Sequence, residues 1–256
     1  TISKVSKALV TIREEGGAVA LGRVLTLIIE TDLDGLERAI KAANDASREH
    51  PCRVIVLASE SNASTQEARL DAEIRVGGDA GASEVIVLKA FGDAATNTES
   101  LVTGLLLPDA PVVAWWPSAC SPAPANTAVG QIASRRLIDS ALQADSKAFL
   151  AQFAKNYQPG DGDLAWTRIT LWRAQLAALF ELHKTRTVKS ITVIGSSSSP
   201  SADLLAMWLG LKLGVRAHVN NKVQQVEVQG IYGVEVEFED GHLSVTRPDQ
   251  VATIRQ

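Results

Sequence analysis

The chain has 256 residues, with 25 basic and 29 acidic side chains and a formal net charge of −4 at pH 7. Apolar residues make up 46% and charged residues 21%, as in ordinary globular proteins, and the length allows one large domain or two modest ones. Without basic blocks, this charge argues against a nucleic-acid partner or an anionic membrane surface, because both need clustered Lys and Arg.

Residues suited to metal or thiol chemistry are scarce, with four His and two Cys. Cys52 and Cys120 are too few for a disulfide framework or a four-thiolate metal site, which fits a reducing cytoplasm. The histidines are too dispersed along the chain to form a metal-ligand motif. No apolar run approaches the length of a membrane span. We therefore expect a cytoplasmic protein without a metal, a cofactor or a membrane partner.

The first part of the chain predicts neighbouring parallel strands. Arg23–Ile29 and Arg53–Ala58 are dense in β-branched residues and Leu, a pattern typical of buried strands. Asp34 followed by Glu37 matches a capping box, so we expect a helix that starts there and ends before Pro51. A strand, helix and strand joined by short connections predict two parallel neighbours in one sheet.

Three more strands and one helix are expected before residue 118. Leu70–Val76 alternates between apolar and charged residues, which predicts a half-buried strand, and Glu84–Phe91 reads as a buried one. A short helix near Glu99–Leu107 precedes a strand at Val112–Trp116. The Ser- and Pro-rich stretch Ser118–Thr127 is expected to be a loop.

The middle of the chain is predicted to be mainly helical. Ala128–Leu142 reads as one helix, with Arg135 and Asp139 paired at i,i+4, and Phe149–Tyr157 as another. From Asp163 to Lys184 the sequence predicts one long helix whose wide apolar face indicates burial between layers.

The last section predicts a second sheet. A strand at Ser190–Ile194 leads through a serine loop to a helix that starts at Pro200 and ends near Gly214. Further strands are expected at Val223–Val228, Val234–Phe238 and Leu243–Thr246. The Asp240-Gly241 turn indicates that the last two form a hairpin. We predict two α/β domains, 1–157 and 158–256, with mixed sheets flanked by helices, the second ending in the antiparallel hairpin.

Two glycine- or serine-rich motifs suggest phosphate binding. Gly160–Ala165 matches G-x-G-x-x-A, but a helix and not a strand precedes it, so helix capping is the better interpretation. Ser196, Ser197, Ser198 and Ser199 follow a strand and precede a helix, where backbone N–H groups can hold a sugar phosphate. The alternative is a plain serine-rich helix cap, since no Walker lysine follows.

No nucleophile, base and orienting group come together in the sequence, so no catalytic residue is predicted. The pair Trp115-Trp116 is more informative, because adjacent strand residues point to opposite faces. One indole can therefore enter the core while the other faces a partner, where Trp is frequent. Packing of both rings beneath helices is the alternative.

Five blocks of the sequence resemble the OpcA family, the bacterial glucose-6-phosphate dehydrogenase assembly proteins. In chain order the blocks are Gly16–Leu27, Asp71–Gly81, Leu106–Pro117, Ser134–Ser140 and Asp163–Arg173. The resemblance implies a protein without catalytic activity of its own that binds glucose-6-phosphate dehydrogenase. Such proteins favour the active oligomer, improve its response to glucose 6-phosphate, and so support NADPH production in the oxidative pentose phosphate pathway.

Under this hypothesis the candidate contact residues are Trp115, Trp116, Arg168, Arg75 and Arg135. Some relatives are under thioredoxin control, and Cys120 is the better placed thiol for that role here. Two alternatives stay open. One alternative is a sugar-phosphate-binding enzyme or sensor that uses Ser196–Ser199. The other is a purely structural subunit.

Overall fold

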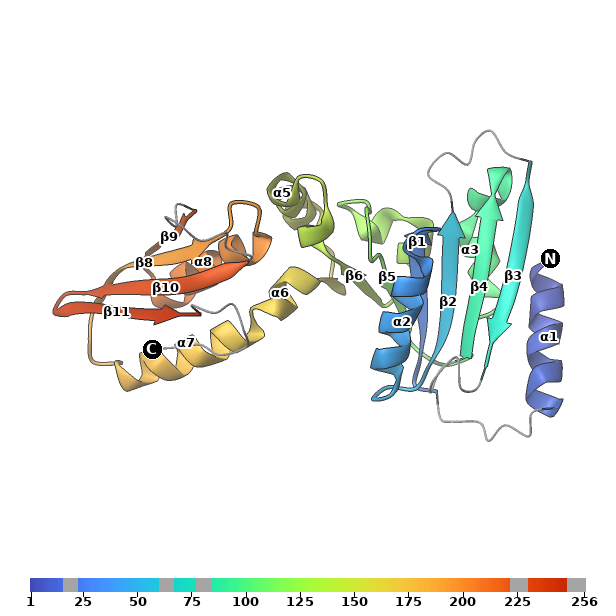
Figure 1. Cartoon of the computed structure of the whole chain (residues 1–256), viewed down its shortest axis with the longest axis horizontal. Coiled ribbons are helices and arrows are strands. Elements are labelled where there is room, and N and C mark those ends of the chain that lie inside the picture. The colour runs from blue at the N-terminus through green and yellow to red at the C-terminus, as the bar shows by residue number, and fades with distance from the viewer. Residues whose placement is uncertain (16–22, 60–66, 77–83, 222–229, 248–256) are drawn as a thin grey trace. The chain divides into compact units, whose positions relative to one another are not determined.

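The computed structural model describes residues 1–15, 23–59, 67–76, 84–221 and 230–247. The chain divides into two compact units (Figure 1). The first comprises Thr1–Asp139 and Lys155–Gly162, and the second comprises Ser140–Ala154 and Asp163–Gln256. The expected α/β class is confirmed, with a seven-stranded first sheet and a four-stranded second sheet, both flanked by helices. The domain boundary between residues 157 and 158 stays a prediction.

The first sheet has the strand order β3-β4-β2-β1-β5-β6-β7. Its strands are β1 (Leu25–Asp32), β2 (Cys52–Ser59), β3 (Arg69–Arg75), β4 (Glu84–Phe91), β5 (Val112–Trp115), β6 (Arg135–Ile138) and β7 (Asp161–Asp163). β1 runs parallel to both of its neighbours, β2 and β5, so the predicted parallel pairing is confirmed. β4 and β6 extend the parallel run, and β3 is an antiparallel edge strand. β3 confirms the strand predicted at Leu70–Val76, and its Leu70 and Ile74 are half-buried, whereas Ala72 and Val76 are exposed.

Helices cover both faces of the first sheet. They are α1 (Ile2–Glu15), α2 (Leu36–Ser47), α3 (Thr98–Thr103) and α4 (Ala128–Ile132), with the 3-10 helices η3 (Gly92–Ala95) and η4 (Pro124–Asn126). Figure 1 shows α2 in front of the sheet and α3 behind it. α2 buries Leu36, Ala39, Ile40 and Ala43 against β1, β2 and β4, and this apolar contact holds the helix on the sheet.

The predicted capping box of α2 is wrong. Gly35 is the N-cap residue and makes no side-chain cap bond. The carboxylate that serves this helix end comes from the strand instead, because Asp32 Oδ1 accepts from the Gly35 N–H at 2.5 Å. Glu37 turns outward and pairs with Arg75.

The single helix predicted over Ala128–Leu142 is also wrong. α4 stops at Ile132, β6 follows, and a 3-10 helix, η5, covers Ser140–Leu142. Ser134 donates from both its N–H and its hydroxyl to the carbonyl oxygen of Val112. These bonds start the pairing of β6 with β5, so a tertiary contact overrides the local helical pattern. Arg135 and Asp139 therefore form no i,i+4 pair on a helix.

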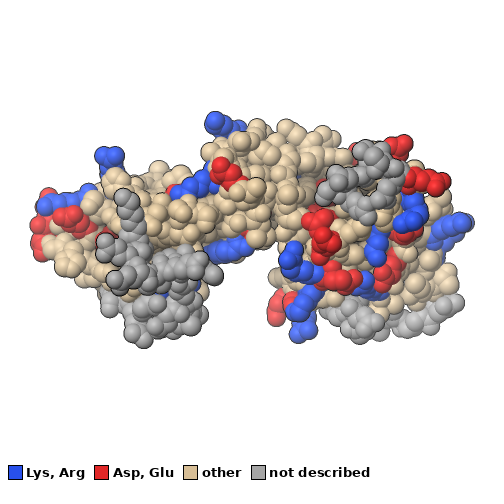
Figure 2. All heavy atoms as spheres, turned by 45° about the horizontal axis from the view of Figure 1, so that its top comes forward, with Lys and Arg blue, Asp and Glu red and all other residues tan. Residues whose placement is uncertain are grey.

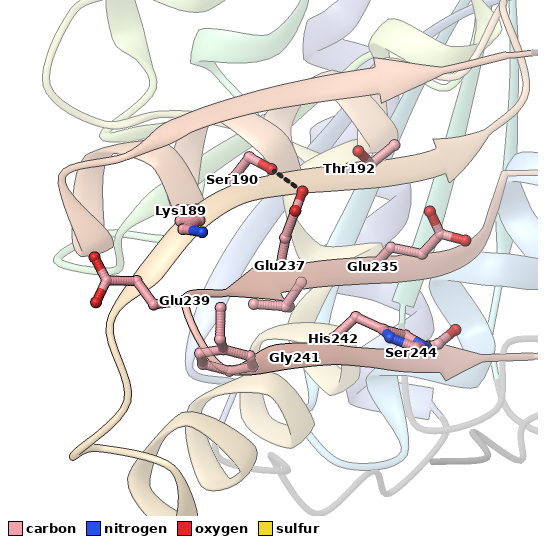
Figure 3. Close-up of a pocket in the computed structure, with 11 residues that line it drawn as sticks. Lys189, Ser190, Thr192, Glu235, Glu237, Glu239, Gly241, His242 and Ser244 are labelled. Carbon is pink, nitrogen blue, oxygen red and sulfur yellow. Dashed lines mark hydrogen bonds between the residues drawn. The ribbon is translucent and has the colours of Figure 1, made fainter.

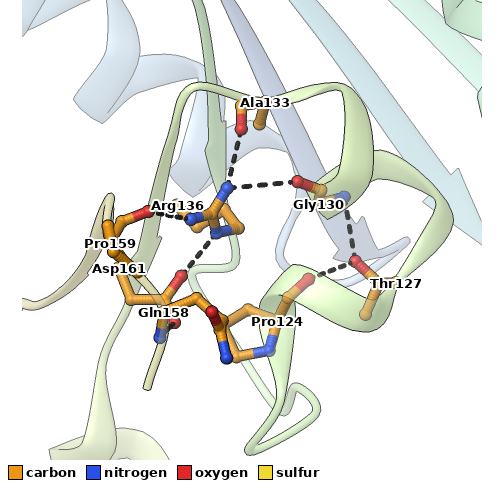
Figure 4. Close-up of polar contacts among 8 residues, drawn as sticks. All are labelled: Pro124, Thr127, Gly130, Ala133, Arg136, Gln158, Pro159 and Asp161. Atoms are coloured by element: carbon orange, nitrogen blue, oxygen red, sulfur yellow. Dashed lines mark hydrogen bonds and ion pairs between the residues drawn. The ribbon is translucent and has the colours of Figure 1, made fainter. Parts of the chain in front are cut away.

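Arg136 is buried and explains why this segment is extended. Its Nε donates to Asp161, and Asp161 Oδ2 accepts from the N–H of Gln158 at 2.8 Å (Figure 4). The Arg136 Nη atoms donate at 2.6–3.3 Å to the carbonyl oxygens of Gly130, Ala133 and Pro159. Each guanidinium nitrogen thus has an acceptor, which a buried charge requires. The contacts tie β6 to the turn that precedes β7.

The second sheet has the strand order β11-β10-β8-β9. Its strands are β8 (Val188–Gly195), β9 (Arg216–Asn220), β10 (Ile231–Phe238) and β11 (Gly241–Thr246). β10 and β11 form the predicted antiparallel hairpin, and β8 pairs with β10 on its other side. β9, parallel to β8, was not predicted. The strand expected at Val223–Val228 lies outside the described residues.

The helices of the second unit include two that share one apolar core with this sheet. The helices are α5 (Ser146–Asn156), α6 (Leu164–Arg168), α7 (Thr170–Leu182) and α8 (Pro200–Leu213), and the shared core takes side chains from α7 and α8. The start of α8 at Pro200 and its end before Gly214 agree with the sequence. The long helix predicted from Asp163 is interrupted at Ile169, whose ψ is 7°. Ile169 is fully buried in the same core as Trp172 and Leu176, so burial of this side chain accompanies the break.

Replacing Asp161 by Ala should destabilise the fold strongly, because the Arg136 guanidinium then stays buried without its carboxylate. Removing one partner of a buried ion pair costs about 3–5 kcal/mol, which urea unfolding followed by circular dichroism measures. Asp45→Ala is the matched control, because it breaks the exposed Lys41–Asp45 pair on α2 and should change the unfolding free energy by less than about 1 kcal/mol. Equal losses in the two variants would contradict the structural role of Asp161.

Candidate functional site

In the first sheet, the direction in which the chain crosses from one strand to the next reverses beside β1. From β1 the chain crosses through α2 to β2 on one side, whereas from β5 it crosses through α4 to β6 on the other side. Two connections that run in opposite directions diverge at the carboxyl ends of the parallel strands. In open α/β sheets this switch point is where a crevice forms and where ligands bind.

A pocket of about 340 Å³ lies at this switch point. Its lining consists of Glu30, Thr31, Asp32, Ser59, Trp116, Ser118, Ala119, Cys120, Ser121 and Thr127. We call it the switch-point pocket. β1 supplies the first three residues, the end of β2 supplies Ser59, and the segment after β5 supplies the rest. Among the described residues, the lining holds two carboxylates and no basic side chain.

Glu30 and Trp116 form the inner wall of the pocket. The Trp116 indole Nε1 donates to Glu30 Oε2 at 2.6 Å, and the Trp116 side chain is only 4% exposed. Burial raises the pKa of the Glu30 carboxyl, and the hydrogen bond from the indole opposes that shift only in part. Glu30 itself is half-buried, and an acid with a perturbed pKa in a crevice is a typical functional-site candidate.

Thr31 adds a buried hydroxyl that lacks a partner. Thr31 is 6% exposed, and its Oγ1 is enclosed without a hydrogen bond. A Cβ placed on Gly35 would lie 2.6 Å from Thr31 Oγ1 and 2.9 Å from Asp32 Oδ1, so only glycine admits both polar groups at the start of α2. An unsatisfied buried hydroxyl costs about 1–3 kcal/mol, which a bound donor would offset.

A larger hollow lies on the open face of the second sheet, with a volume of about 560 Å³. Figure 3 shows Glu235 and Glu237 on β10 lying between β8 and the side chains of β11. Glu237 lies opposite His242 in the register of β10 and β11. Its Oε2 accepts a hydrogen bond from the Ser190 hydroxyl at 3.4 Å. Antiparallel sheets commonly keep one solvated polar face, and this explains the hollow without a ligand.

The two adjacent tryptophans do not supply an exposed indole. Trp116 is buried at the switch-point pocket, and Trp115 is half-buried against the core beneath α2. The sequence expected one of the two indoles to face a partner; Trp116 is the one that is buried, and its indole bonds Glu30. Cys120 lines the same pocket and is half-buried.

The three candidate arginines lie on separate elements. Arg75 on β3 donates to both oxygens of Glu37 at 2.7 and 2.9 Å, and to Glu73 at 2.7 Å. These carboxylates raise the pKa of Arg75, and the arginine lowers the pKa of both glutamates. Arg135 is exposed on β6, and Arg168 is exposed at the end of α6.

The serine loop uses much of its hydrogen-bonding capacity internally. Ser196 and Ser198 join their hydroxyls at 3.0 Å, and the N–H of Ser199 donates to the carbonyl of Ser196. Ser197 is exposed and Ser199 is buried at the N-cap of α8. Asp203 lies in the first turn, where its carboxylate is paired with Lys147 Nζ at 3.0 Å. A phosphate site here stays a prediction.

Gly160–Ala165 caps a helix, as the sequence interpretation favoured. Asp163 is the N-cap of α6, and its Oδ1 accepts from the N–H of Ala165 at 2.9 Å.

Sequence reasoning missed Glu30, Thr31 and Asp32. The available signal was three polar residues directly after the buried run of β1, because the carboxyl ends of parallel strands meet at one edge.

Across the described ranges, no group of three or more His, Cys, Asp or Glu is arranged to hold a metal ion. Within the same residues, every helix is too short or too polar to cross a bilayer. On the face shown in Figure 2, the described acidic and basic side chains are interspersed rather than gathered into a field of one sign.

Two family models match the chain. The first is described as the N-terminal domain of the glucose-6-phosphate dehydrogenase subunit, and it matches residues 43–155. The second is described as the C-terminal domain of the same kind of subunit, and it matches residues 159–256. A comparison with curated proteins found no match. The two family matches run through most of the chain and confirm the family resemblance, and four of the five sequence blocks, all except Gly16–Leu27, lie within the matched residues.

Glu30→Gln should raise the free energy of unfolding at pH 7. Because the folded protein raises the pKa of Glu30, the folded state binds this proton more tightly, and the ionised carboxylate opposes folding above that pKa. The neutral amide removes this penalty, so the gain should shrink as pH falls and Glu30 becomes protonated. Urea unfolding from pH 4 to pH 7 measures it. The exposed change Glu49→Gln is the control, and an equal effect there, or a gain that grows on acidification, would contradict the burial effect.

Proposed function

The chain belongs to the OpcA family of glucose-6-phosphate dehydrogenase assembly proteins, and from that premise we propose that it is a non-catalytic assembly factor and allosteric activator of this dehydrogenase. The observation that carries the proposal is the match of the two family models along the chain. In this role the protein acts in the cytoplasm, supports the active oligomer and increases NADPH production in the oxidative pentose phosphate pathway.

Activation of this kind requires no catalytic group. An activator shifts its target by binding the active state more tightly than the inactive state, and the shift equals that difference in affinity. What the chain needs is an exposed surface that has the chemistry of an interface and is specific for one state of the dehydrogenase.

The outward side of α7 is unusually apolar. We define the α7 outer face as Leu171, Ala174, Gln175, Ala178 and Leu182, all of which are exposed. Their spacing places them along one side of the helix, next to the buried stripe of Trp172, Leu176 and Leu179. Leu171 is 64% and Leu182 is 77% exposed. Contiguous exposed apolar residues are typical of protein interaction sites.

Cationic and aromatic groups adjoin this face at its amino-terminal end. The Arg173 guanidinium lies 4.0 Å from the ring centroid of Trp166, which is 36% exposed. Arg168 is exposed in the preceding turn, and the segment from Leu164 to Phe180 contains no acidic residue. Trp and Arg are the residues most enriched in interface hot spots.

These features support α6 and α7 as the contact surface for the dehydrogenase, with Arg168 and Trp166 as its anchors. The chemistry fits a partner surface with an apolar centre and carboxylates opposite the two arginines. Trp166 takes the role that the sequence suggested for Trp115 or Trp116. Arg75 and Arg135 are the weaker candidates, and the charge of Arg75 is already balanced by Glu37 and Glu73.

Mixing the protein with the dehydrogenase from the same source tests the function. Native mass spectrometry should show a complex, and the dehydrogenase rate should rise at lower glucose 6-phosphate concentrations. A complex without a kinetic change would support a purely structural subunit. No complex and no kinetic change would contradict the proposal.

Arg168→Glu and Leu171→Glu should each weaken the complex at least about tenfold, as expected when a hot-spot residue worth more than about 1.4 kcal/mol is lost. Sedimentation or surface plasmon resonance measures the affinity, and circular dichroism checks the fold. Leu211→Glu on α8 is the matched control, because Leu211 is 82% exposed and lies outside the α7 outer face. Unchanged affinity in both α6–α7 variants would remove this surface from the interface.

A further inference from the structure

We infer that the switch-point pocket is a binding site for one organic cation, a guanidinium or ammonium group. Nothing in the family descriptions assigns this site, and the inference depends on the first unit alone. It rests on the topology, the charge of the lining, the acceptors that β1 presents and the volume of the pocket.

Topology places the pocket where a ligand is expected. β1 has parallel neighbours on both sides, and the chain leaves β1 and β5 in opposite directions. The resulting crevice at the strand ends is the general ligand position of open α/β sheets. The volume of about 340 Å³ falls at the lower end of the range for small-molecule sites.

The charge of the lining selects a cation. Glu30 and Asp32 are the charged residues among the ten described residues that line the pocket, and none of the ten is Lys, Arg or His. An anion such as a phosphate would meet two carboxylates without a compensating charge, which disfavours its entry. A cation is attracted to both carboxylates, and more strongly at Glu30 because that side chain is half-buried.

The polar groups of β1 match a ligand that only donates hydrogen bonds. Guanidinium and ammonium groups are donors without acceptors. A carboxylate has about four acceptor positions. Glu30 can therefore accept from Trp116 and from a cation at the same time. Asp32 can likewise accept from the Gly35 N–H and from a cation. Thr31 Oγ1, buried and without a partner, is a third acceptor at the same strand end, on the side of α2 next to Gly35.

A divalent metal ion fits this site less well. Calcium takes six to eight oxygen ligands and magnesium needs an octahedral set, whereas the pocket provides two carboxylates and several hydroxyls. No metal-binding group of His, Cys, Asp and Glu occurs among the described residues. The volume of the pocket matches the end of a basic side chain or a small amine better than a single ion.

Two sources can supply such a group. One is a free small amine, and the other is a Lys or Arg side chain of the dehydrogenase proposed above as the partner. The chemistry at the pocket is the same, and the experiment separates the two sources.

The 256-residue chain is titrated with agmatine as the guanidinium probe and putrescine as the ammonium probe, and binding is followed by calorimetry and by Trp fluorescence. We expect saturable binding of at least one probe and none of glucose 6-phosphate. Glu30→Gln and Asp32→Asn should each weaken binding at least tenfold. Asp71→Asn, an exposed acid on β3, is the matched control and should leave binding unchanged. Absence of saturable binding of both probes would overturn the inference.

Thr31→Val separates a ligand role from a structural one. The change keeps the shape and removes the unpartnered hydroxyl, so the variant should be at least as stable as the parent while binding the probe more weakly. Unchanged probe binding in all three variants would place the probe elsewhere and overturn the inference.

Repeating the titration with the dehydrogenase present identifies the source. If a basic side chain of the partner fills the pocket, agmatine competes with complex formation and Glu30→Gln weakens the complex. If neither agmatine nor Glu30→Gln changes the affinity of the complex, the ligand is a free amine. The inference stands in either case. A chain that binds the probe but never the dehydrogenase would contradict the proposed function and leave the pocket assignment intact.

Discussion

The buried ion pair between Arg136 and Asp161 determines how the last strands of the first sheet are arranged. A guanidinium inside a protein needs an acceptor for each of its donors. Here Asp161 and three backbone carbonyls supply them. To reach them, residues 135–138 must be extended and the chain must return past Arg136. Gly160 makes that return possible, because its φ is +100° and a Cβ there would approach the Ser134 carbonyl oxygen to 2.6 Å.

The same return sets the start of α6 in the second unit. Two residues after Asp161, Asp163 caps α6 and also accepts from the N–H of Ser140 at 3.2 Å. α6 and α7 then carry Trp166, Arg168 and the α7 outer face. The proposed contact surface therefore begins where the chain leaves the Arg136 network.

Much of the architecture follows from the sequence because apolar pattern and turn chemistry agree with it. β1, β2 and β4 are buried runs of β-branched residues, and the Asp240-Gly241 turn specifies the final hairpin. The predictions failed where a distant residue decides the conformation. Residues 128–142 have a helical pattern, yet Ser134 pairs with Val112 and Arg136 requires Asp161. Neither contact leaves a signal within the local window.

The candidate site was harder to predict for a related reason. Glu30, Thr31 and Asp32 form no known motif, and they become a site only because β1 lies between β2 and β5. Strand order depends on which helix crosses which face, and a single sequence does not specify it. The tryptophans do lie at a strand end, but the destination of the Trp116 indole depends on Glu30, which is far from it in the sequence.

The pocket also shows a conflict between stability and binding. Burial of the Glu30 carboxyl opposes folding above its pKa, and the Thr31 hydroxyl loses its hydrogen bonds to water without gaining another. Neither feature helps the sheet, since an amide or a methyl group would fit in its place. Polar groups that oppose folding are expected at sites where a ligand later satisfies them. A cation bound in the switch-point pocket would lower the pKa of Glu30 and donate a hydrogen bond to the hydroxyl of Thr31. Its binding would thus stabilise the folded first unit.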